Sequence, residues 1–188
     1  VVFPPKMMII ETGAFAGCTA LVKIDLPDGI KKLEGDLFRD CRNLMELHIP
    51  DSVTEICSNA FENSGVFEKY KNGKKEELYI DKWLISYKGH DRKVLRIKEG
   101  TIGIANMDFF EKKELCAVYF PESLKYIGAD AFVYTNIDRI ELPKNLRYIG
   151  CAAFRGTKIK EVLIPETVVV IEQWAFMDCE KLEIITVK

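Results

Sequence analysis

The sequence predicts an α/β repeat solenoid, a coil of short turns that stack on one another. Units of 22 or 23 residues recur along most of the chain, and each contains one short strand pattern that a proline usually ends. A repeat of this length is one turn of a coil that cannot bury its apolar side alone, so neighbouring turns must stack. The units begin at Ile10, Leu33, Ile56, Ile104, Ile127, Ile149 and Ile171, with start-to-start spacings of 23, 23, 48, 23, 22 and 22 residues.

The strand pattern is clear in the unit at Ile10, where Ile24 and Leu26 alternate with Lys23 and Asp25. A period of two is typical of a strand with one buried face. Proline lacks an N–H and cannot continue a ladder, so it marks where the chain leaves the sheet. Pairing of equivalent strands in successive turns predicts a parallel sheet of about seven or eight strands. The matching segments are 45–50, 117–121, 139–143, 161–165 and 183–187.

The return path of each turn carries a small residue followed by phenylalanine. Stacked turns would line up these rings through the core, while the small residue lets successive backbones approach. Too few residues remain in each unit for a long helix, so we expect short helical turns or loops on this side. The pairs are Ala14-Phe15, Ala60-Phe61, Ala131-Phe132, Ala153-Phe154 and Ala175-Phe176, with Leu37-Phe38 as a variant.

One irregular insert, at about 68–93, interrupts the repeat and doubles its spacing. Within it, two apolar runs at 78–80 and 83–87 flank Asp81-Lys82, which predicts a small β-hairpin. Insertions in repeat proteins map to one face and sometimes form the binding face. Two interpretations remain open: an elaborated turn covered by Trp83, which is the simpler one, or a dedicated site. Residues 1–188 are expected to form a single domain.

The overall composition argues against several classes of protein. The 188 residues are 48% hydrophobic and 30% charged, with a net charge of −2, which is ordinary for a soluble protein with a core. That balance favours neither nucleic acid nor a membrane surface as a partner. The lysine-rich run 69–75 precedes Glu76 and Glu77 and is interpreted as a solvated turn. No apolar stretch approaches the ~20 residues of a membrane span. No signal peptide is visible, and because the chain starts inside a repeat we expect a fragment of a longer array.

Six cysteines are present, and three of them share one slot of the repeat, three residues after the Phe. A repeated slot indicates a repeated packing role, so Cys18 and Cys41 are predicted to be buried, reduced thiols in neighbouring turns. A bond between these two is the open alternative, since stacked turns could bring them close. Cys179 occupies the same slot, and the absence of any CxxC pair argues against a zinc site.

These motifs together resemble the BspA-like leucine-rich repeat family. Its pattern runs Ile-Gly-x-x-Ala-Phe-x-x-Cys, then Leu, then Ile-x-Ile-Pro-x-x-Val, and clear matches lie at 127–132 and 44–53. Lys98 replaces the usual Pro without affecting the fold. The resemblance implies a right-handed superhelix with a concave parallel sheet and short helical turns or loops on its convex side. It also implies a non-enzymatic interaction or adhesion module of a bacterial surface or secreted protein.

The chain contains no P-loop, nucleophile elbow, zinc-protease or dinucleotide motif. We therefore expect no catalytic residues, no cofactor and no metal. Three hypotheses follow: a module that binds a protein or glycan, a passive spacer that displays another domain, and an enzyme whose site arises from the insert. Exposed apolar side chains clustered on one stretch would favour binding, whereas uniformly charged outward positions would favour a spacer.

The outward positions of the strands are the candidate ligand-binding residues. Later turns place Tyr119, Leu163 and Ile184 outward, whereas the first turns offer charged groups and an imidazole. Tyr and Arg often anchor interfaces, so binding is expected towards the C-terminal half. The expected ligand is a protein or glycan, including host or matrix proteins, met at the cell surface or outside the cell. The alternative is that a neighbouring domain or a contact between copies of the chain, rather than a ligand, covers these apolar residues. The candidate residues are His48, Arg96, Tyr119, Arg139, Glu141, Glu161, Leu163 and Ile184.

Overall fold

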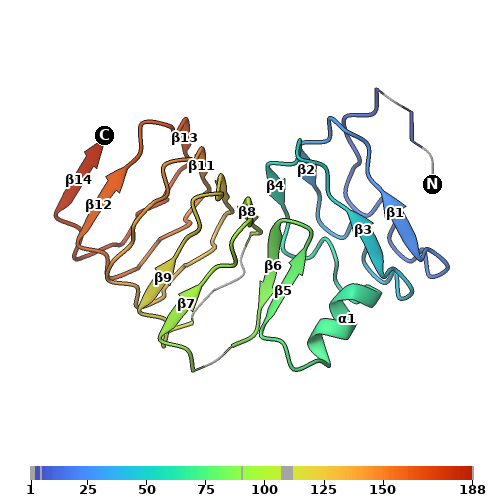
Figure 1. Cartoon of the computed structure of the whole chain (residues 1–188), viewed down its shortest axis with the longest axis horizontal. Coiled ribbons are helices and arrows are strands. Elements are labelled where there is room, and N and C mark those ends of the chain that lie inside the picture. The colour runs from blue at the N-terminus through green and yellow to red at the C-terminus, as the bar shows by residue number, and fades with distance from the viewer. Residues whose placement is uncertain (1–2, 5, 90, 107–111, 188) are drawn as a thin grey trace.

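The computed structural model describes residues 3–4, 6–89, 91–106 and 112–187. They form a solenoid of stacked turns with the two chain ends at opposite ends of the stack (Figure 1). Two rows of short parallel strands run along the coil, and one short helix interrupts it. The predicted solenoid class and its parallel pairing are therefore confirmed.

The first row contains the strands that the alternation predicted, except that 139–143 forms no strand and only six strands, rather than seven or eight, are found in the described residues. Their inward residues, such as Ile24 and Val118, are buried except in Glu46–His48, where Leu47 is partly buried, and in the end strand Ile184–Val187, which is exposed throughout. The row is not one continuous sheet, because its strands pair two by two, with Arg139 joined to Ala117 by a single bridge. We call its exposed side chains the strand face. The pairs are β1 (Lys23–Asp25) with β3 (Glu46–His48), β7 (Val94–Arg96) with β9 (Ala117–Tyr119), and β12 (Glu161–Ile164) with β14 (Ile184–Val187).

A second row of two-residue strands was not predicted. It holds the first residue of every unit except that at Ile10, and that residue is buried in most turns. Ile127, for example, pairs with Ile104 on one side and Ile149 on the other. The members are β2 (Lys32–Leu33), β4 (Glu55–Ile56), β8 (Gly103–Ile104), β10 (Tyr126–Ile127), β11 (Tyr148–Ile149) and β13 (Val170–Ile171).

The insert contains the predicted hairpin, preceded by a helix that was not predicted. The hairpin pairs β5 (Glu77–Ile80) with β6 (Trp83–Tyr87), and helix α1 spans Gly65–Lys71. Strand β6 also pairs in parallel with β8, which aligns Leu84 with Ile104. Leu84 therefore stands where a repeat isoleucine would stand, so the doubled spacing hides one additional turn of the coil.

Helix α1 begins where its unit would otherwise supply a strand of the first row. The N–H of Val66 donates to the carbonyl of Leu44 in the preceding turn, as at other strand starts, and the helix then turns away. A Cβ at Gly65 would lie 2.7 Å from the carbonyl oxygens of Arg42 and Leu44. Only glycine allows this close approach of two backbones.

The phenylalanine rings stack as expected from their place in the repeat. Successive centroids are 5.8 Å apart for Phe15 and Phe38 and 5.7 Å apart for Phe38 and Phe61, with nearly parallel planes. A second stack joins Phe132, Phe154 and Phe176 at 5.5 and 5.4 Å. These rings and the inward strand residues form two hydrophobic clusters, one mainly in the N-terminal turns and the hairpin and one mainly in the C-terminal turns.

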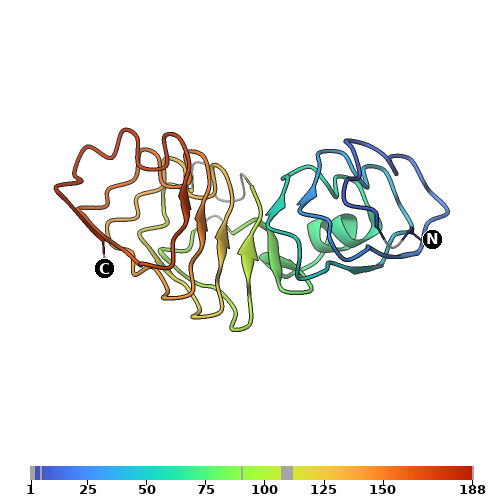
Figure 2. The same cartoon turned by 90° about the horizontal axis from the view of Figure 1, so that it is seen from above.

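The turns before and after the insert also touch each other directly. The N–H of Asn106 donates to the carbonyl of Ile56 at 3.0 Å, and its side-chain Nδ2 donates to Glu55, 51 residues away in sequence. The neighbouring N–H of Ala105 donates to the carbonyl of Leu84 in the insert. The hairpin therefore pairs with the turn that follows it, while the turns before and after the insert are in direct contact at Ile56 and Asn106. Figure 2 shows the resulting two stacks of turns, joined at the green segment.

The cysteine prediction is half right. Cys41 is buried, and its thiol donates to the carbonyl of Phe15 in the preceding turn at 3.0 Å. Cys179 makes the same bond to Phe154 at 3.1 Å. Cys18 is exposed, against the prediction, because none of the described residues before its turn covers its slot. Neither Cys18 nor Cys41 is in a disulfide.

Candidate functional site

The strand face carries all eight predicted site residues, and each is exposed. They come from five strands of the first row and from the bridged segment around Arg139. Alternation alone therefore placed them correctly. The largest apolar members are Tyr119, Leu163 and Ile184, with 49%, 47% and 53% of their surface accessible.

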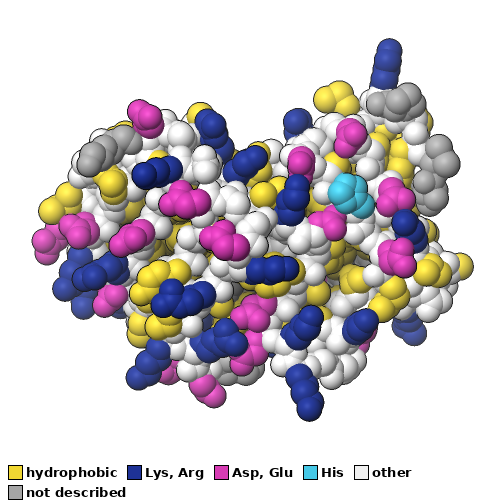
Figure 3. All heavy atoms as spheres, in the orientation of Figure 1, with side chains coloured by type: hydrophobic (Ala, Val, Ile, Leu, Met, Phe, Trp, Pro, Cys, Tyr) yellow, Lys and Arg dark blue, Asp and Glu magenta, His cyan; other side chains and the backbone are white. Residues whose placement is uncertain are grey.

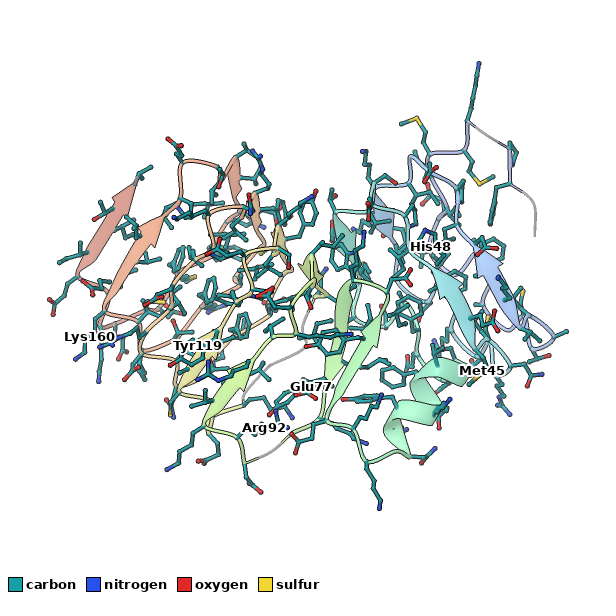
Figure 4. All side chains as sticks on the ribbon, viewed as in Figure 1. Met45, His48, Glu77, Arg92, Tyr119 and Lys160 are labelled. Atoms are coloured by element: carbon teal, nitrogen blue, oxygen red, sulfur yellow. The ribbon has the colours of Figure 1, made fainter. Side chains whose placement is uncertain are left out.

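An arginine lies on the most prominent aromatic ring of the strand face. The guanidinium carbon of Arg96 is 4.1 Å from the ring centroid of Tyr119, and the two residues are direct partners in the β7–β9 ladder. A cation over a ring is an attractive contact, and it holds both side chains in one orientation. The pair thus forms a preformed platform with a charged edge on β7 and β9; Figure 4 labels Tyr119.

A groove of about 570 Å³ runs over the next turns. Five of the predicted residues line it, and they bring together charges of both signs and two aliphatic side chains. Lys160 adds a further cation at the rim (Figure 4). The predicted members are Arg139, Glu141, Glu161, Leu163 and Ile184.

The eighth predicted residue, His48, lies apart from this group, in the N-terminal half. Its Nδ1 is 3.0 Å from a carboxylate oxygen of Asp81 at the tip of the hairpin. Its neighbours on the strand face are paired as well, since Lys23 lies 3.6 Å from Glu46. Two charge pairs thus form on this part of the strand face, whereas the described structure has no ion pair among the charged residues of the C-terminal groove.

A larger hollow, of about 980 Å³, lies between this N-terminal part of the strand face and the insert. Strand β3 forms one wall, β5 the other, and α1 closes one end, as their neighbouring places in Figure 1 show. Its rim carries lysines from α1 and from the loop that follows, and Figure 3 shows this mixed charged surface around the single cyan imidazole.

A family model for the BspA type leucine rich repeat region matches residues 1–79 and 86–188, in six copies. The chain belongs to the BspA-type leucine-rich repeat family. No curated protein is similar enough in sequence to count as a match.

Solved structures share the BspA-type fold at low sequence identity. One is a leucine rich cell surface protein from Faecalibacterium prausnitzii, with 24% identity and a TM-score of 0.54, covering 92% of this chain and 55% of that one. Another is the pneumococcal vaccine antigen PcpA, with 20% identity and a TM-score of 0.57, covering 89% and 51%. The chain thus spans about half of each of these structures.

Sequence reasoning missed the hollow in this BspA-type repeat. The lysine run at 69–75 was interpreted as a solvated turn, yet Lys69, Lys74 and Lys75 all line the hollow. The available signal was that the insert starts where a strand of the first row was due. That position predicts an interrupted ladder and hence a gap on the strand face.

Two partly buried titrating groups among the described residues of this BspA-type chain have raised pKa values. Burial, together with a hydrogen bond to the Glu172 carboxylate, raises the pKa of Tyr148, so its phenol stays protonated. Burial also raises the pKa of the Cys57 thiol, which keeps it a poor nucleophile. Among the residues that the structure describes, no three His, Cys, Asp or Glu side chains gather as metal ligands. None of the described helices is both long and apolar enough to cross a bilayer.

Proposed function

We propose that this chain is a non-enzymatic interaction module of a surface or secreted protein, and that it binds a protein or glycan on its strand face. The observation that carries the proposal is the exposed apolar group of Tyr119, Leu163 and Ile184 in the strand row, to which the end strand β14 adds Ile185 and Val187. Water-facing strand positions gain nothing from such side chains unless a partner covers them. The mixture differs from the uniformly charged face expected of a spacer.

The Arg96–Tyr119 pair is suited to anchor such a partner. Tyrosine and arginine are enriched among the residues that contribute most to interface affinity. The 4.1 Å stack already restricts both side chains, so less conformational freedom is lost when a partner binds. The same flat surface would suit an aromatic side chain or the apolar face of a sugar ring.

The groove beyond this pair supplies polar contacts. Arg139 and Lys160 can donate to carboxylates or hydroxyls, and Glu141 and Glu161 can accept from hydroxyls or amides. Leu163 adds an apolar contact among them. Mixed charges around a small apolar patch are typical of non-obligate interfaces rather than of enzyme pockets.

Two relatives of similar fold support a location at the cell surface. One is described as a leucine rich cell surface protein, and the other is a vaccine antigen, a role that fits an accessible surface protein. The leucine-rich repeat family is typically non-catalytic, and function must be argued from a site. The proposed site is therefore a binding surface.

The direct test is the double variant Tyr119→Ala with Leu163→Ala. The parent and the variant are applied to an array of extracellular-matrix proteins, plasma proteins and glycans. We expect the variant to lose the parent's signal while its melting temperature changes by less than about 4 °C, since both side chains are half exposed.

A matched control is Tyr134→Ala. That ring also lies beside an arginine, with 5.6 Å to the Arg155 guanidinium carbon, but it belongs to a Phe-bearing turn away from the strand face. The control should bind as the parent does. Equal binding by the parent and the double variant would remove the strand face from consideration.

A further inference from the structure

One strand position of the first row, between β3 and β7, is not filled by a strand in the described residues. Strand β3 pairs only with β1, and β7 pairs only with β9 among the described strands. The unit that begins at Ile56 should supply the strand between them, but its chain enters helix α1 instead. A strand with one unpaired side presents a row of backbone donors and acceptors to any chain that can reach it.

The unpaired side of β3 faces the hollow. In a parallel ladder, alternate residues direct both of their backbone groups to the same neighbour. The N–H of Glu46 donates to the carbonyl of Val22, so Glu46 faces β1 and Leu47 faces away from it. Ile49, on the same side as Leu47, donates its N–H to the Asp81 carboxylate at 2.6 Å. The insert thus caps one donor of this edge and leaves the groups of Leu47 open to the hollow.

The side chains beside this edge also lack a cover. Ile24 in β1, the ladder partner of Leu47, is 1% exposed, whereas Leu47 is only partly buried. Val66 at the start of α1 is partly exposed in the same hollow. In β5, on the opposite wall, Leu78 and Ile80 are buried members of the same core cluster. An incoming aliphatic side chain would complete this cluster.

The second wall is also a sheet edge. Strand β5 is the last member of the six-stranded sheet and pairs only with β6 in the described structure. A segment in the hollow would therefore lie between two strand edges, β3 and β5. A hollow of about 980 Å³ is at the upper end of the range of ligand sites.

The rim of the hollow carries lysines that favour a negatively charged ligand. Within the described residues, Lys69, Lys74 and Lys75 have no ion-pair partner. Of the acidic residues that line the hollow, Glu46, Glu77 and Asp81 are each paired, and only Asp25 has no ion pair in the described structure, so the unpaired charge is mainly positive. Lys98 adds a fourth cation at the rim. Unpaired cations around a hydrogen-bonding edge complement an acidic segment.

We propose that the β3 edge takes an extended segment of a partner protein as an added strand. The segment carries an aliphatic side chain over Leu47 and Val66, and acidic residues beside the α1 lysines. Backbone hydrogen bonds to an exposed strand edge supply affinity in this binding mode, and alternate side chains supply specificity. This site is separate from the C-terminal groove and does not depend on it.

The test is a selection from random seven-residue peptides displayed on phage, followed by affinity measurements on the enriched peptides. We expect sequences that alternate aliphatic with polar residues and contain Asp or Glu. Leu47→Pro removes the open N–H while sparing the β1 ladder, and should weaken binding about ten-fold. Methylation of the central backbone nitrogen of the peptide should have a similar effect.

A second variant tests the same site without a proline, because Leu47→Pro could weaken binding simply by disturbing the fold. Lys69→Glu with Lys74→Glu and Lys75→Glu changes only exposed side chains and should also reduce binding at least about ten-fold. The matched control reverses three exposed lysines elsewhere, Lys125, Lys144 and Lys181, and should bind as the parent does. The double variant Tyr119→Ala with Leu163→Ala should bind these peptides normally, which separates this site from the proposed ligand surface.

Several results would overturn the proposal. They are a selection that enriches nothing, enrichment of basic peptides, or binding that neither Leu47→Pro nor the charge reversal weakens. Self-association of the chain that Leu47→Pro abolishes would assign the edge to a second copy and contradict the partner assignment.

Discussion

His48 and Asp81 join the strand row to the insert. The His48 Nδ1 lies 3.0 Å from the same Asp81 oxygen that accepts the N–H of Ile49 at 2.6 Å. One carboxylate at the hairpin tip thus holds both the backbone and an outward side chain at the end of β3. This anchor keeps the hairpin beside β3 and sets the width of the hollow.

Removing the anchor should destabilise the protein. Asp81 has a φ of 48°, so Asp81→Gly deletes the carboxylate without adding backbone strain. We expect a loss of about 1–3 kcal/mol in the free energy of unfolding, because the N–H of the buried Ile49 loses a charged acceptor. Urea denaturation measures it. The neighbouring Lys82→Ala should change stability by less than about 1 kcal/mol, since its partner Asp51 is exposed. Equal losses in the two variants would contradict the anchor.

The Lys82–Asp51 pair should contribute a small, pH-dependent stability. The hydrogen bond from Lys82, 2.8 Å from Asp51, lowers the pKa of that carboxyl. A lowered folded-state pKa stabilises the fold above the unfolded pKa of about 3.9, and the contribution disappears as pH falls through the folded value. The stability difference between the parent and Asp51→Asn should therefore be present at neutral pH and vanish in strong acid. A difference that grows on acidification would reverse the assigned sign.

The stacked rings should dominate core stability. Phe38 is fully buried between Phe15 and Phe61, so Phe38→Ala should cost about 3–5 kcal/mol. Phe176 occupies the same repeat slot but is only partly buried, so Phe176→Ala should cost clearly less. Denaturant unfolding of both variants gives the comparison. Similar values would mean that stacking across turns contributes little.

The cysteines should react in the order of their exposure. Cys18 is exposed and should be alkylated rapidly in the folded protein. Burial raises the pKa of the Cys41 thiol, and the Phe15 carbonyl accepts its hydrogen bond, so Cys41 should react only after unfolding. Mass spectrometry after timed alkylation separates the two sites. Fast labelling of Cys41 under native conditions would contradict the packing of its turn.

Repetition explains why most of the fold could be predicted. The alternation around Ile24 marks a strand, and the recurrence of Phe at one slot marks a stack. The second strand row escaped prediction because a two-residue strand such as β10 carries no period. Helix α1 escaped it because the helix is only seven residues long, too short to show a clear period, although Ser64 is a common N-cap residue.

The candidate site could be predicted only in part. Outward residues such as Tyr119 and Leu163 follow from the alternation, and their exposure agrees with it. Their role in binding remains a prediction. The unfilled strand position beside β3 depends on how α1 and the hairpin sit against the strand row, and that placement is not encoded in any local pattern. Asp81 shows this well, because its partner Ile49 lies 32 residues earlier.

The central claim is that the insert leaves the outer edge of β3 unpaired. Residue-resolved amide hydrogen exchange of Leu47 and Ile24 tests it most directly, because these two residues are ladder partners. By the same alternation that turns Leu47 away from β1, the N–H of Ile24 faces β3. We expect the Leu47 amide to exchange on the order of a hundred-fold faster than that of Ile24. Equal protection of the two amides would show that the edge is already occupied within the chain, and would contradict the account.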